Sequence, residues 1–226
     1  MRVYSNQQRS FTEVRHVAVA IAVYREGQQH TGILHKSENL DEVILGHLEW
    51  HNRLKESDPN DSYLWVDPPI PTRRARQVAA RCREILRENA RGIPYAFSPP
   101  NDCFDAKTGR FLLGPSRVGL TCATFVLAVF EAAGIRLAEY DTWPQERPHD
   151  AEWQKFVIEL LEHEQSGASA EHVGLVKKET GAVRYRPEDV AGCAASDQLP
   201  CLFRIAEPLS QEILNQLHAL GKPLHG

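Results

Sequence analysis

The chain has 226 residues and a net charge of −4 at neutral pH, and apolar residues make up 42% of it. That length suits a single large domain with a sizeable core, and the charge is too small to favour an acidic or a basic partner. No apolar run approaches the length of a membrane-spanning helix. The five cysteines are widely spaced and form no Cys-x-x-Cys pair, which argues against a disulfide framework or a structural zinc site.

The N-terminal sequence bears on location and on domain organisation. Residues 1–16, MRVYSNQQRSFTEVRH, lack the apolar segment of a secretory signal, so we expect a cytoplasmic protein whose cysteines are reduced. Repeats and low-complexity tracts are absent, and no stretch between residues 15 and 220 resembles a linker. We therefore predict one α+β domain over residues 1–226, in which residues 1–15 are a candidate for a poorly ordered arm.

Strand-like patterns come first along the chain. Residues 17–23 alternate β-branched side chains with alanines, a period of two that is typical of a strand. Two further apolar stretches, HTGIL (30–34) and VILGHLEWH (43–51), complete a predicted meander of two or three strands over residues 16–51. The segment DPNDSYLWVDPPIP (58–71) is rich in proline and aspartate and is predicted to be a loop.

Helical patterns follow. Apolar residues at helical spacing predict a helix that starts near Pro71 and stops at Gly92, followed by a long ordered loop to residue 117. A second helix is expected over residues 121–134, and Asp150 could cap a third. A short strand, CLFRIA (201–206), and a final helix after Ser210 are expected to close the chain.

One cysteine stands at the start of the second predicted helix, in the stretch GLTCATFVLAVFEAAG (119–134). Cys122 shares the apolar face of that helix, where a buried cysteine behaves as a small hydrophobic residue. Thr121 is a favourable N-cap, however, and it puts Cys122 in the first helical turn. Unpaired amides and the positive end of the helix dipole lower the pKa of a thiol there and stabilise an oxyanion. The position therefore predicts a nucleophile, with a structural core cysteine as the alternative.

The sequence around Cys122 resembles the nucleophile segment of NlpC-type, papain-like cysteine hydrolases. That family has a Gly-x-Pro-Tyr stretch, then a glycine-rich loop, then a cysteine at the start of an apolar helix. The matching residues are Gly92, Pro94, Tyr95 and Cys122, and the resemblance covers residues 92–135. The chain departs from the family's usual Asp-Cys-Ser-Gly, since it reads Thr-Cys-Ala-Thr. The resemblance implies a papain-like α+β fold, in which an antiparallel sheet packs against the cysteine-bearing helix.

A cysteine hydrolase also needs an imidazole base and a group that orients it. Three segments compete for the base: HVAVAIAV at His16, HTGIL at His30 and HVGLV at His172. His172 follows the cysteine, as in the ordinary family order, but its segment can equally be a short helix. His16 and His30 precede the cysteine. That order resembles the circularly permuted branch of the superfamily, which includes relatives of lecithin:retinol acyltransferase.

We predict the permuted arrangement, with His16 as the base. His16 heads the most apolar strand of the chain and shares a face with alternate alanines, which would let the cysteine helix approach closely. The resemblance to the permuted branch makes His47 the candidate orienting group, with Glu49 in reserve. His30 forms a tidier hairpin with His47 and remains the rival base.

The remaining signals predict no cofactor and no metal. Arginines surround the helix expected after Pro71 and interleave with glutamates, so we expect a solvated face rather than a nucleic-acid surface. His47 and His51 could share a strand face, but the glutamate-bearing helix of metalloproteases is missing.

The predicted function is that of a cysteine hydrolase, of peptidase or amidase type, or an acyltransferase. Cys122 would attack an amide, ester or thioester carbonyl, His16 would act as base, and His47 would orient it. Peptide, amide or acyl-lipid compounds are the expected substrates. The alternative is a papain-like scaffold without catalysis, which binds or regulates another protein; the changed motif around Cys122 supports it. The sequence leaves the acyl acceptor and the oligomeric state open.

Overall fold

The computed structural model describes residues 2–25, 27–39, 42–114 and 117–224. These residues form a mixed α+β structure on an antiparallel sheet of six strands, in the order β1-β6-β2-β3-β4-β5. The strands are β1 (Val3–Ser5), β2 (Val17–Arg25), β3 (Gln28–Lys36), β4 (Val43–Trp50), β5 (Arg53–Ser57) and β6 (Tyr63–Val66). The expected meander over residues 16–51 corresponds to β2, β3 and β4.

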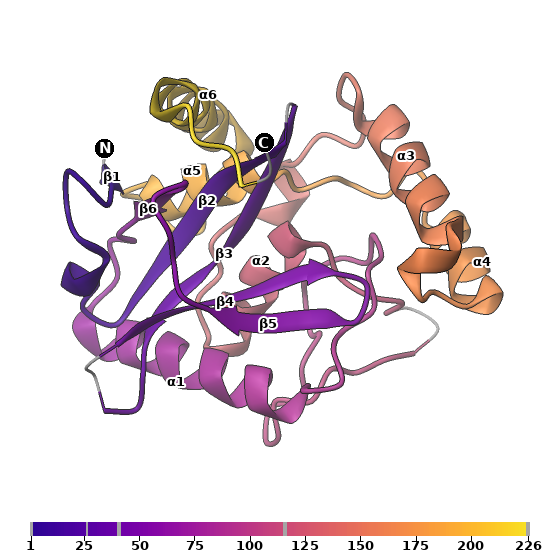
Figure 1. Ribbon diagram of the computed structural model, residues 1–226, viewed down its shortest axis with the longest axis horizontal. Helices are drawn as coiled ribbons and strands as arrows, with labels where there is room; N and C mark the ends of the chain where they lie inside the picture. The colour runs from indigo at the N-terminus through magenta and orange to yellow at the C-terminus, as the bar shows by residue number, and fades with distance from the viewer. Residues whose placement is uncertain (1, 26, 40–41, 115–116, 225–226) are drawn as a thin grey trace.

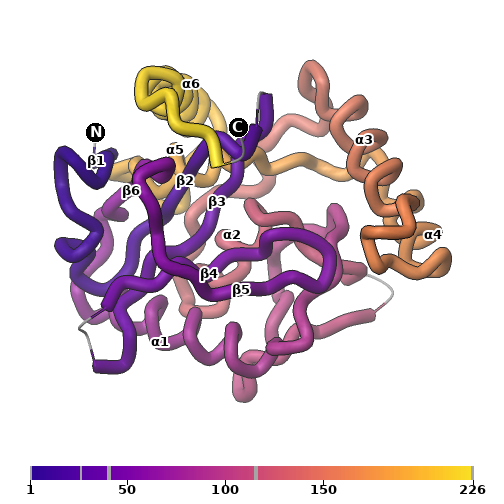
Figure 2. The backbone as a smooth tube through the Cα atoms, viewed as in Figure 1, coloured from indigo at the N-terminus to yellow at the C-terminus, as the bar shows by residue number. Residues whose placement is uncertain are grey.

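Helices follow the sheet in the chain. They are α1 (Thr72–Glu88), α2 (Cys122–Ala132), α3 (Asp150–Glu162), α4 (Ala170–Lys178), α5 (Pro187–Ala195) and α6 (Phe203–Leu220). α1 and α2 pack against the sheet, α5 and α6 pair near one end of it, and α3 and α4 stand together at the side (Figure 1). The backbone trace shows the long connections that carry the chain out to α3 and back (Figure 2). None of the described helices is long and apolar enough to cross a membrane.

The two faces of β2 enter different apolar clusters. One face carries its β-branched side chains: Val17, Val19 and Ile21. The other carries its alanines: Ala18, Ala20 and Ala22. The β-branched face packs in the main core with the apolar side chains of α1 and α2. The alanine face is covered by Phe11, Val14 and Trp65 instead. The expectation that the cysteine helix packs on the alanine face is therefore wrong, because the N-terminal segment and the Trp65 side chain of the neighbouring strand β6 cover that face.

The sheet also includes segments that were not expected to be strands. Residues 63–66 form β6 inside the segment predicted as a loop, and all four are buried. β6 lies between β1 and β2, and its partner β1 lies within the predicted arm. A strand this short, flanked by proline and aspartate, carries little periodicity of its own, so pairing with its neighbours decides its conformation.

The expected helices are confirmed near Pro71, within residues 121–134 and from Asp150. Asp150 is not the cap that was expected, however, because it is the first residue of α3 and His149 is the N-cap. The end of the chain differs from the prediction. Cys201 makes only an isolated bridge to Ala138, and α6 already begins at Phe203, so the predicted strand over residues 201–206 is wrong. A short apolar run fits a buried strand or the first turns of a helix equally well, and periodicity alone does not separate them.

Two glycines allow the segment before α2 to run close to other backbone. Gly92 has φ +91°, and a Cβ at that position would overlap the backbone of Asn52. A Cβ on Gly119 would overlap the carbonyl group of Pro94. The Leu120 amide donates to the same Pro94 carbonyl at 2.9 Å, which forms a bridge beside Tyr95. These contacts bring the Gly-x-Pro-Tyr stretch against the residues that lead into Cys122.

Gly92→Ala is expected to destabilise the protein by at least about 2 kcal/mol, because it adds left-handed strain and a backbone overlap. Gly174→Ala in α4 is the matched control, since a Cβ there meets nothing within 4 Å. That variant should be neutral or more stable by about 0.5–1 kcal/mol. Urea denaturation measures both changes. Wild-type stability in Gly92→Ala would show that the chain does not need this close approach.

Candidate functional site

Cys122 is the first residue of α2, and a reciprocal pair of threonines caps the helix. The Thr121 hydroxyl accepts from the Thr124 amide at 3.1 Å, and the Thr124 hydroxyl accepts from the Thr121 amide at 2.8 Å. The Thr-Cys-Ala-Thr sequence thus forms a capping box around the cysteine, which fixes the first helical turn. Cys122 is 6% exposed and belongs to neither apolar cluster.

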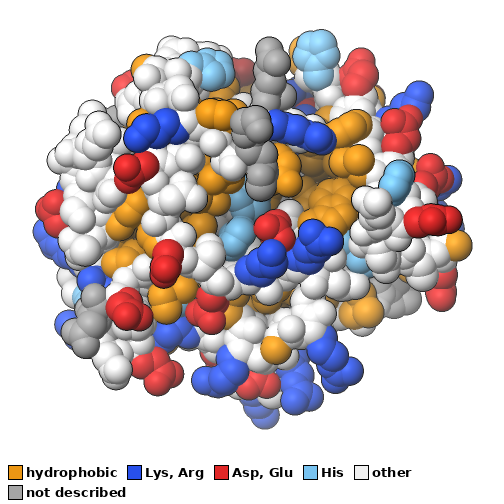
Figure 3. All heavy atoms as spheres, viewed as in Figure 1, with side chains coloured by type: hydrophobic (Ala, Val, Ile, Leu, Met, Phe, Trp, Pro, Cys, Tyr) orange, Lys and Arg blue, Asp and Glu red, His pale blue; other side chains and the backbone are white. Residues whose placement is uncertain are grey.

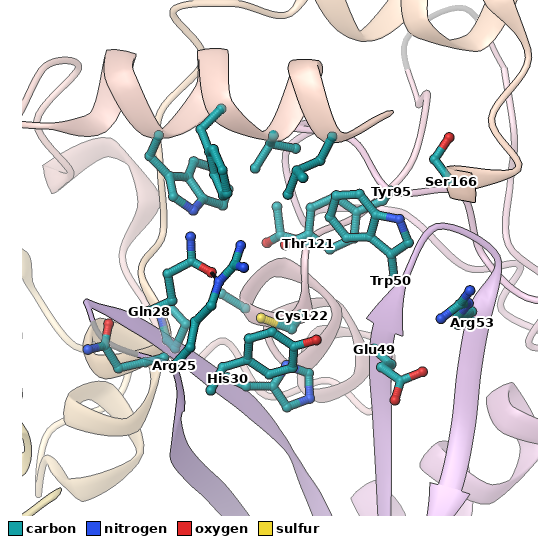
Figure 4. Close-up of a pocket in the computed structure, with 18 of the residues that line it drawn as sticks. Arg25, Gln28, His30, Glu49, Trp50, Arg53, Tyr95, Thr121, Cys122 and Ser166 are labelled. Atoms are coloured by element: carbon teal, nitrogen blue, oxygen red, sulfur yellow. Dashed lines mark hydrogen bonds between the residues drawn. The ribbon is translucent and has the colours of Figure 1, made fainter. Parts of the chain in front are cut away.

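The sheet opens beside this cysteine. β3 and β4 pair along residues 33–36 and 43–46, and the pairing stops there although both strands continue. Beyond the last pair, the Thr31 amide hydrogen-bonds the Cys122 sulfur. Figure 4 shows Cys122 between the ribbons of the two strands. The start of α2 therefore takes the place that continued strand pairing would fill.

Two histidines meet across this opening. His30 Nε2 on β3 lies 2.8 Å from His47 Nδ1 on β4, and the two rings meet edge to face. His47 Nε2 lies 3.4 Å from the Ser57 hydroxyl on β5. A Cβ on Gly32 would lie 2.9 Å from the His47 Cβ, so a glycine at that position lets His47 approach.

The contacts of His47 fit two tautomers of its ring. Burial is the main cause that lowers the pKa of His47, so its ring is neutral at neutral pH. With the proton on Nε2, His47 donates to Ser57 and its Nδ1 accepts from the Nε2–H of His30, which leaves Nδ1 of His30 as the basic nitrogen. With the proton on Nδ1, both hydrogen bonds reverse.

Cys122 and His30 line the same cavity, which has a volume of about 480 Å³. That volume lies within the range of about 300–1,000 Å³ typical of small-molecule sites. Figure 3 shows hydrophobic side chains gathered in a hollow between the sheet and α3, with basic and histidine side chains at its edge. The wall from α3 is apolar: Trp153, Phe156, Val157 and Leu160. The cationic lining residues are Arg25, Arg53 and Arg184.

Burial controls the state of the sulfur. It raises the pKa of the Cys122 thiol, and the amides of Thr31 and Ala123 and the charge of Arg184 offset only part of that rise. The expectation of a lowered cysteine pKa is therefore wrong in direction, because the sulfur is removed from water. The resting group is a thiol, and its use as a nucleophile requires a base.

Tyr95 completes the surroundings of the sulfur. Its phenol lies near Cys122, whose thiol and amide both affect the pKa of the phenol, and burial raises that pKa so that the phenol stays protonated. The Tyr95 amide donates to His51 Nδ1 at 3.3 Å. His172 Nε2 lies 3.0 Å from the Tyr95 carbonyl oxygen and donates to it. The tyrosine of the Gly-x-Pro-Tyr motif is thus held at the cysteine through its own backbone.

The structure does not bring His16 to Cys122. Ala22 pairs with His30, so His16 lies six residues further along β2, roughly 20 Å from that level. Its Nε2 accepts from Arg76 Nε on α1 at 3.2 Å. The expected placement of His16 beside the cysteine is therefore wrong, and His30, the rival, lies in the cavity. His47 is paired with His30, not with His16.

The other candidates have separate surroundings. His172 lies on α4, because the Ser169 hydroxyl caps that helix by accepting from the His172 amide at 3.1 Å. Its ring contacts His51, with centroids 4.4 Å apart. Glu49 lines the cavity and pairs with Lys55 at 2.7 Å. Arg184 and the Thr31 amide were not identified from the sequence, since no local pattern marks them.

Comparisons with protein-family models, with curated proteins and with solved structures found no match. Among the residues that the structure describes, no three histidine, cysteine, aspartate or glutamate side chains form a group that could hold a metal ion.

The histidine behind Tyr95 predicts a pH dependence of stability. Burial and, to a smaller extent, the charge of nearby His172 lower the pKa of His51 to about 4. The unfolded chain binds this proton near pH 6.5, whereas the folded chain binds it only near pH 4. Stability from this group is complete above pH 6.5 and is lost as the pH falls through that window, with a slope of up to about 1.4 kcal/mol per pH unit.

Urea denaturation of wild type and His51→Asn between pH 4 and 7.5 checks this dependence. In the variant, the free energy of unfolding should change less steeply with pH, by the contribution of one proton. Carboxylates elsewhere contribute equally to both proteins. Identical slopes would mean that His51 titrates alike in the folded and unfolded chains.

Proposed function

We propose that the protein is a cysteine hydrolase or acyltransferase, with Cys122 as nucleophile, His30 as general base and His47 as the group that orients it. One observation carries the proposal: Cys122 and His30 line the same cavity, and His47 holds the His30 ring at 2.8 Å. Covalent acyl transfer needs a nucleophile, a base that takes its proton and a third group that orients the base. His30 takes the role that the sequence assigned to His16.

The arrangement of the chain supports a papain-like, NlpC-like fold of the permuted type. The strands that carry His30 and His47 precede the helix that begins with Cys122. That helix packs on the antiparallel sheet through β3 and β4, which carry the two histidines. The same order of histidine strands and cysteine helix marks the permuted branch that the sequence resembles.

The first chemical step forms a thioester. His30 Nδ1 takes the thiol proton as Cys122 Sγ bonds to the carbonyl carbon, and the carbonyl electron pair moves to oxygen. The Cys122 amide and the Tyr95 hydroxyl, which meet beside the sulfur, donate to that oxyanion. The His30 imidazolium then gives its proton to the leaving nitrogen or oxygen, the carbonyl–leaving-group bond breaks, and an acyl group remains on sulfur.

The second step releases the acyl group. His30 takes a proton from water or another acceptor, which attacks the thioester carbon, and the proton returns to the departing sulfur. Water gives hydrolysis of a peptide, amide or ester, and a different acceptor gives acyl transfer. His47 Nδ1 accepts from His30 Nε2 throughout, which stabilises the positive charge on the His30 ring.

A second candidate is a papain-like scaffold that binds or regulates a protein without catalysis. The observation in its favour is that Cys122 is 6% exposed and that burial raises its pKa. In that case the cavity is a binding site, and the cysteine contributes only to packing. The two functions differ in whether Cys122 can be acylated.

p-Nitrophenyl acetate tests acylation directly. We expect release of p-nitrophenolate and an acetyl group on Cys122, located by peptide mass spectrometry. His30→Ala should slow the acylation by about 100-fold or more, the size typical of a lost general base. His16→Ala is the matched control, a histidine beside the same hairpin at its far end, and should react like wild type. Cys122→Ala should release no p-nitrophenolate above the background.

Two outcomes would contradict the proposal. Acetylation confined to other residues of wild type would favour the scaffold. A His30→Ala rate equal to that of wild type would show that the thiol does not use this histidine.

A further inference from the structure

One arginine is held within the cavity. Arg184 lines it together with Cys122, and the Arg184 side chain is 15% exposed. Its guanidinium carbon lies 3.9 Å from the centre of the Trp153 ring on α3. Stacking on an aromatic ring fixes the plane of a guanidinium and leaves its edges for hydrogen bonding. Arg184 is therefore a preoriented cation in the cavity wall.

The hydrogen-bonding capacity of this guanidinium is only partly used. Nη1 donates to Asp150 Oδ1 at 3.1 Å. Nε is buried and has no hydrogen-bond partner among the described residues. A buried donor without a partner costs about 1–3 kcal/mol, so a ligand that accepts from it gains binding energy. Nε and Nη2 form one edge of the guanidinium, and such an edge matches the two oxygens of a carboxylate.

Asp150 is shared among several arginines. Its Oδ1 also accepts from Arg186, from Nε at 3.0 Å and from Nη2 at 2.9 Å. Arg147 Nε lies 3.4 Å from its Oδ2, and Arg147 has a second partner in Asp189 at 2.8 Å. Asp150 thus positions Arg184, but its single negative charge is shared among three arginines and does not fully neutralise Arg184. This network anchors the arginine from the side of α3.

The other charged side chains of the lining add to a positive field. Arg25 and Arg53 line the cavity and are exposed, and both are labelled in Figure 4. Arg25 Nε donates to the neutral Gln28 at 2.9 Å. Glu49 also lines the cavity, but Lys55 pairs with it at 2.7 Å. A cavity with this balance attracts an anion.

We propose that Arg184 binds a carboxylate of the ligand beside Cys122, so that the substrates are acyl or peptide compounds that carry a carboxylate next to an apolar group. The apolar part lies along the α3 wall, where Phe156 and Leu160 follow Trp153. The substrate class rests on the proposed function, whereas the carboxylate site rests on Arg184 and its neighbours. The charge of Arg184 lowers the pKa of the Cys122 thiol, so this charge lies within electrostatic reach of the sulfur.

A pair of probes with equal shape and different charge tests the site: 4-phenylbutyrate and 4-phenylbutanamide. Isothermal titration uses Cys122→Ala, which keeps the cavity and cannot react. We expect the acid to bind about 10-fold or more tightly than the amide, the size of a charge-assisted hydrogen bond to a buried partner. Equal affinities would overturn the carboxylate site.

Variants of the arginines assign the preference. Arg184→Gln in the same background should bring the two affinities to within about twofold, since the charge is lost. Arg184→Lys should keep part of the preference, because it retains the charge without the planar edge. Arg73→Gln, an exposed arginine of α1 outside the lining of this cavity, should leave the preference unchanged. If Arg184→Gln still prefers the acid, the carboxylate does not bind to this guanidinium. If Arg184→Gln does not fold, an undiminished acid preference in Arg184→Lys leads to the same conclusion.

A third measurement places the anion at the sulfur. Iodoacetate carries a carboxylate and iodoacetamide does not, so the ratio of their alkylation rates reports on an anion site beside the thiol. For Cys122 of wild type this ratio should be about 10-fold higher than for glutathione. In Arg184→Gln the two ratios should be equal. A ratio equal to that of glutathione would place the carboxylate away from the thiol and overturn the substrate class.

The binding and acylation experiments test the carboxylate site and the hydrolase function separately. Acid preference without acetylation of Cys122 would overturn the hydrolase and keep a carboxylate-binding protein. Acetylation with no acid preference would keep the hydrolase and overturn the carboxylate site.

Discussion

The candidate site depends on the divergence of β3 from β4. Backbone amides in a sheet need partners, and where the two strands separate, an amide of β3 becomes available to another acceptor. The Cys122 sulfur takes that place through the Thr31 amide, which couples the start of α2 to the edge of the opening. The histidines of both strands then meet across the same gap. One departure from strand pairing thus brings Cys122, His30 and His47 to the same opening.

The opening also determines the protonation state of the Cys122 sulfur. It removes the sulfur from water, and this loss of solvation outweighs the favourable amides, so the thiol stays protonated at rest. The histidines near it have separate roles. His30 lies in the cavity with the thiol, while His51 and His172 hold the backbone of Tyr95. The site at rest is therefore a buried, protonated thiol in the same cavity as a histidine.

α3 and the segments that flank it form the other side of this opening. α3 supplies the apolar wall, and the segment between α4 and α5 supplies Arg184. Trp153 and Asp150, both on α3, hold that arginine by stacking and by an ion pair. The same helix therefore provides the apolar wall and positions one of the arginines of the cavity. The sheet side contributes His30, Trp50 and the exposed arginines Arg25 and Arg53.

Local patterns in the sequence determined the position of Cys122 at a capped helix start, the strands of residues 16–51 and the helices after Pro71 and Asp150, because caps and short-range periodicity act between near neighbours. They also reduced the candidates for a base to three histidines. Only the tertiary structure showed which of these lies in the cavity with Cys122, since strand register places His30 opposite Ala22 and leaves His16 beyond the far end of β2. The face on which α2 packs, the strand β6 and the placement of Arg184 likewise depend on contacts between distant segments. Residues that meet only through strand register and helix packing leave no local pattern, so these parts of the site follow from the fold alone.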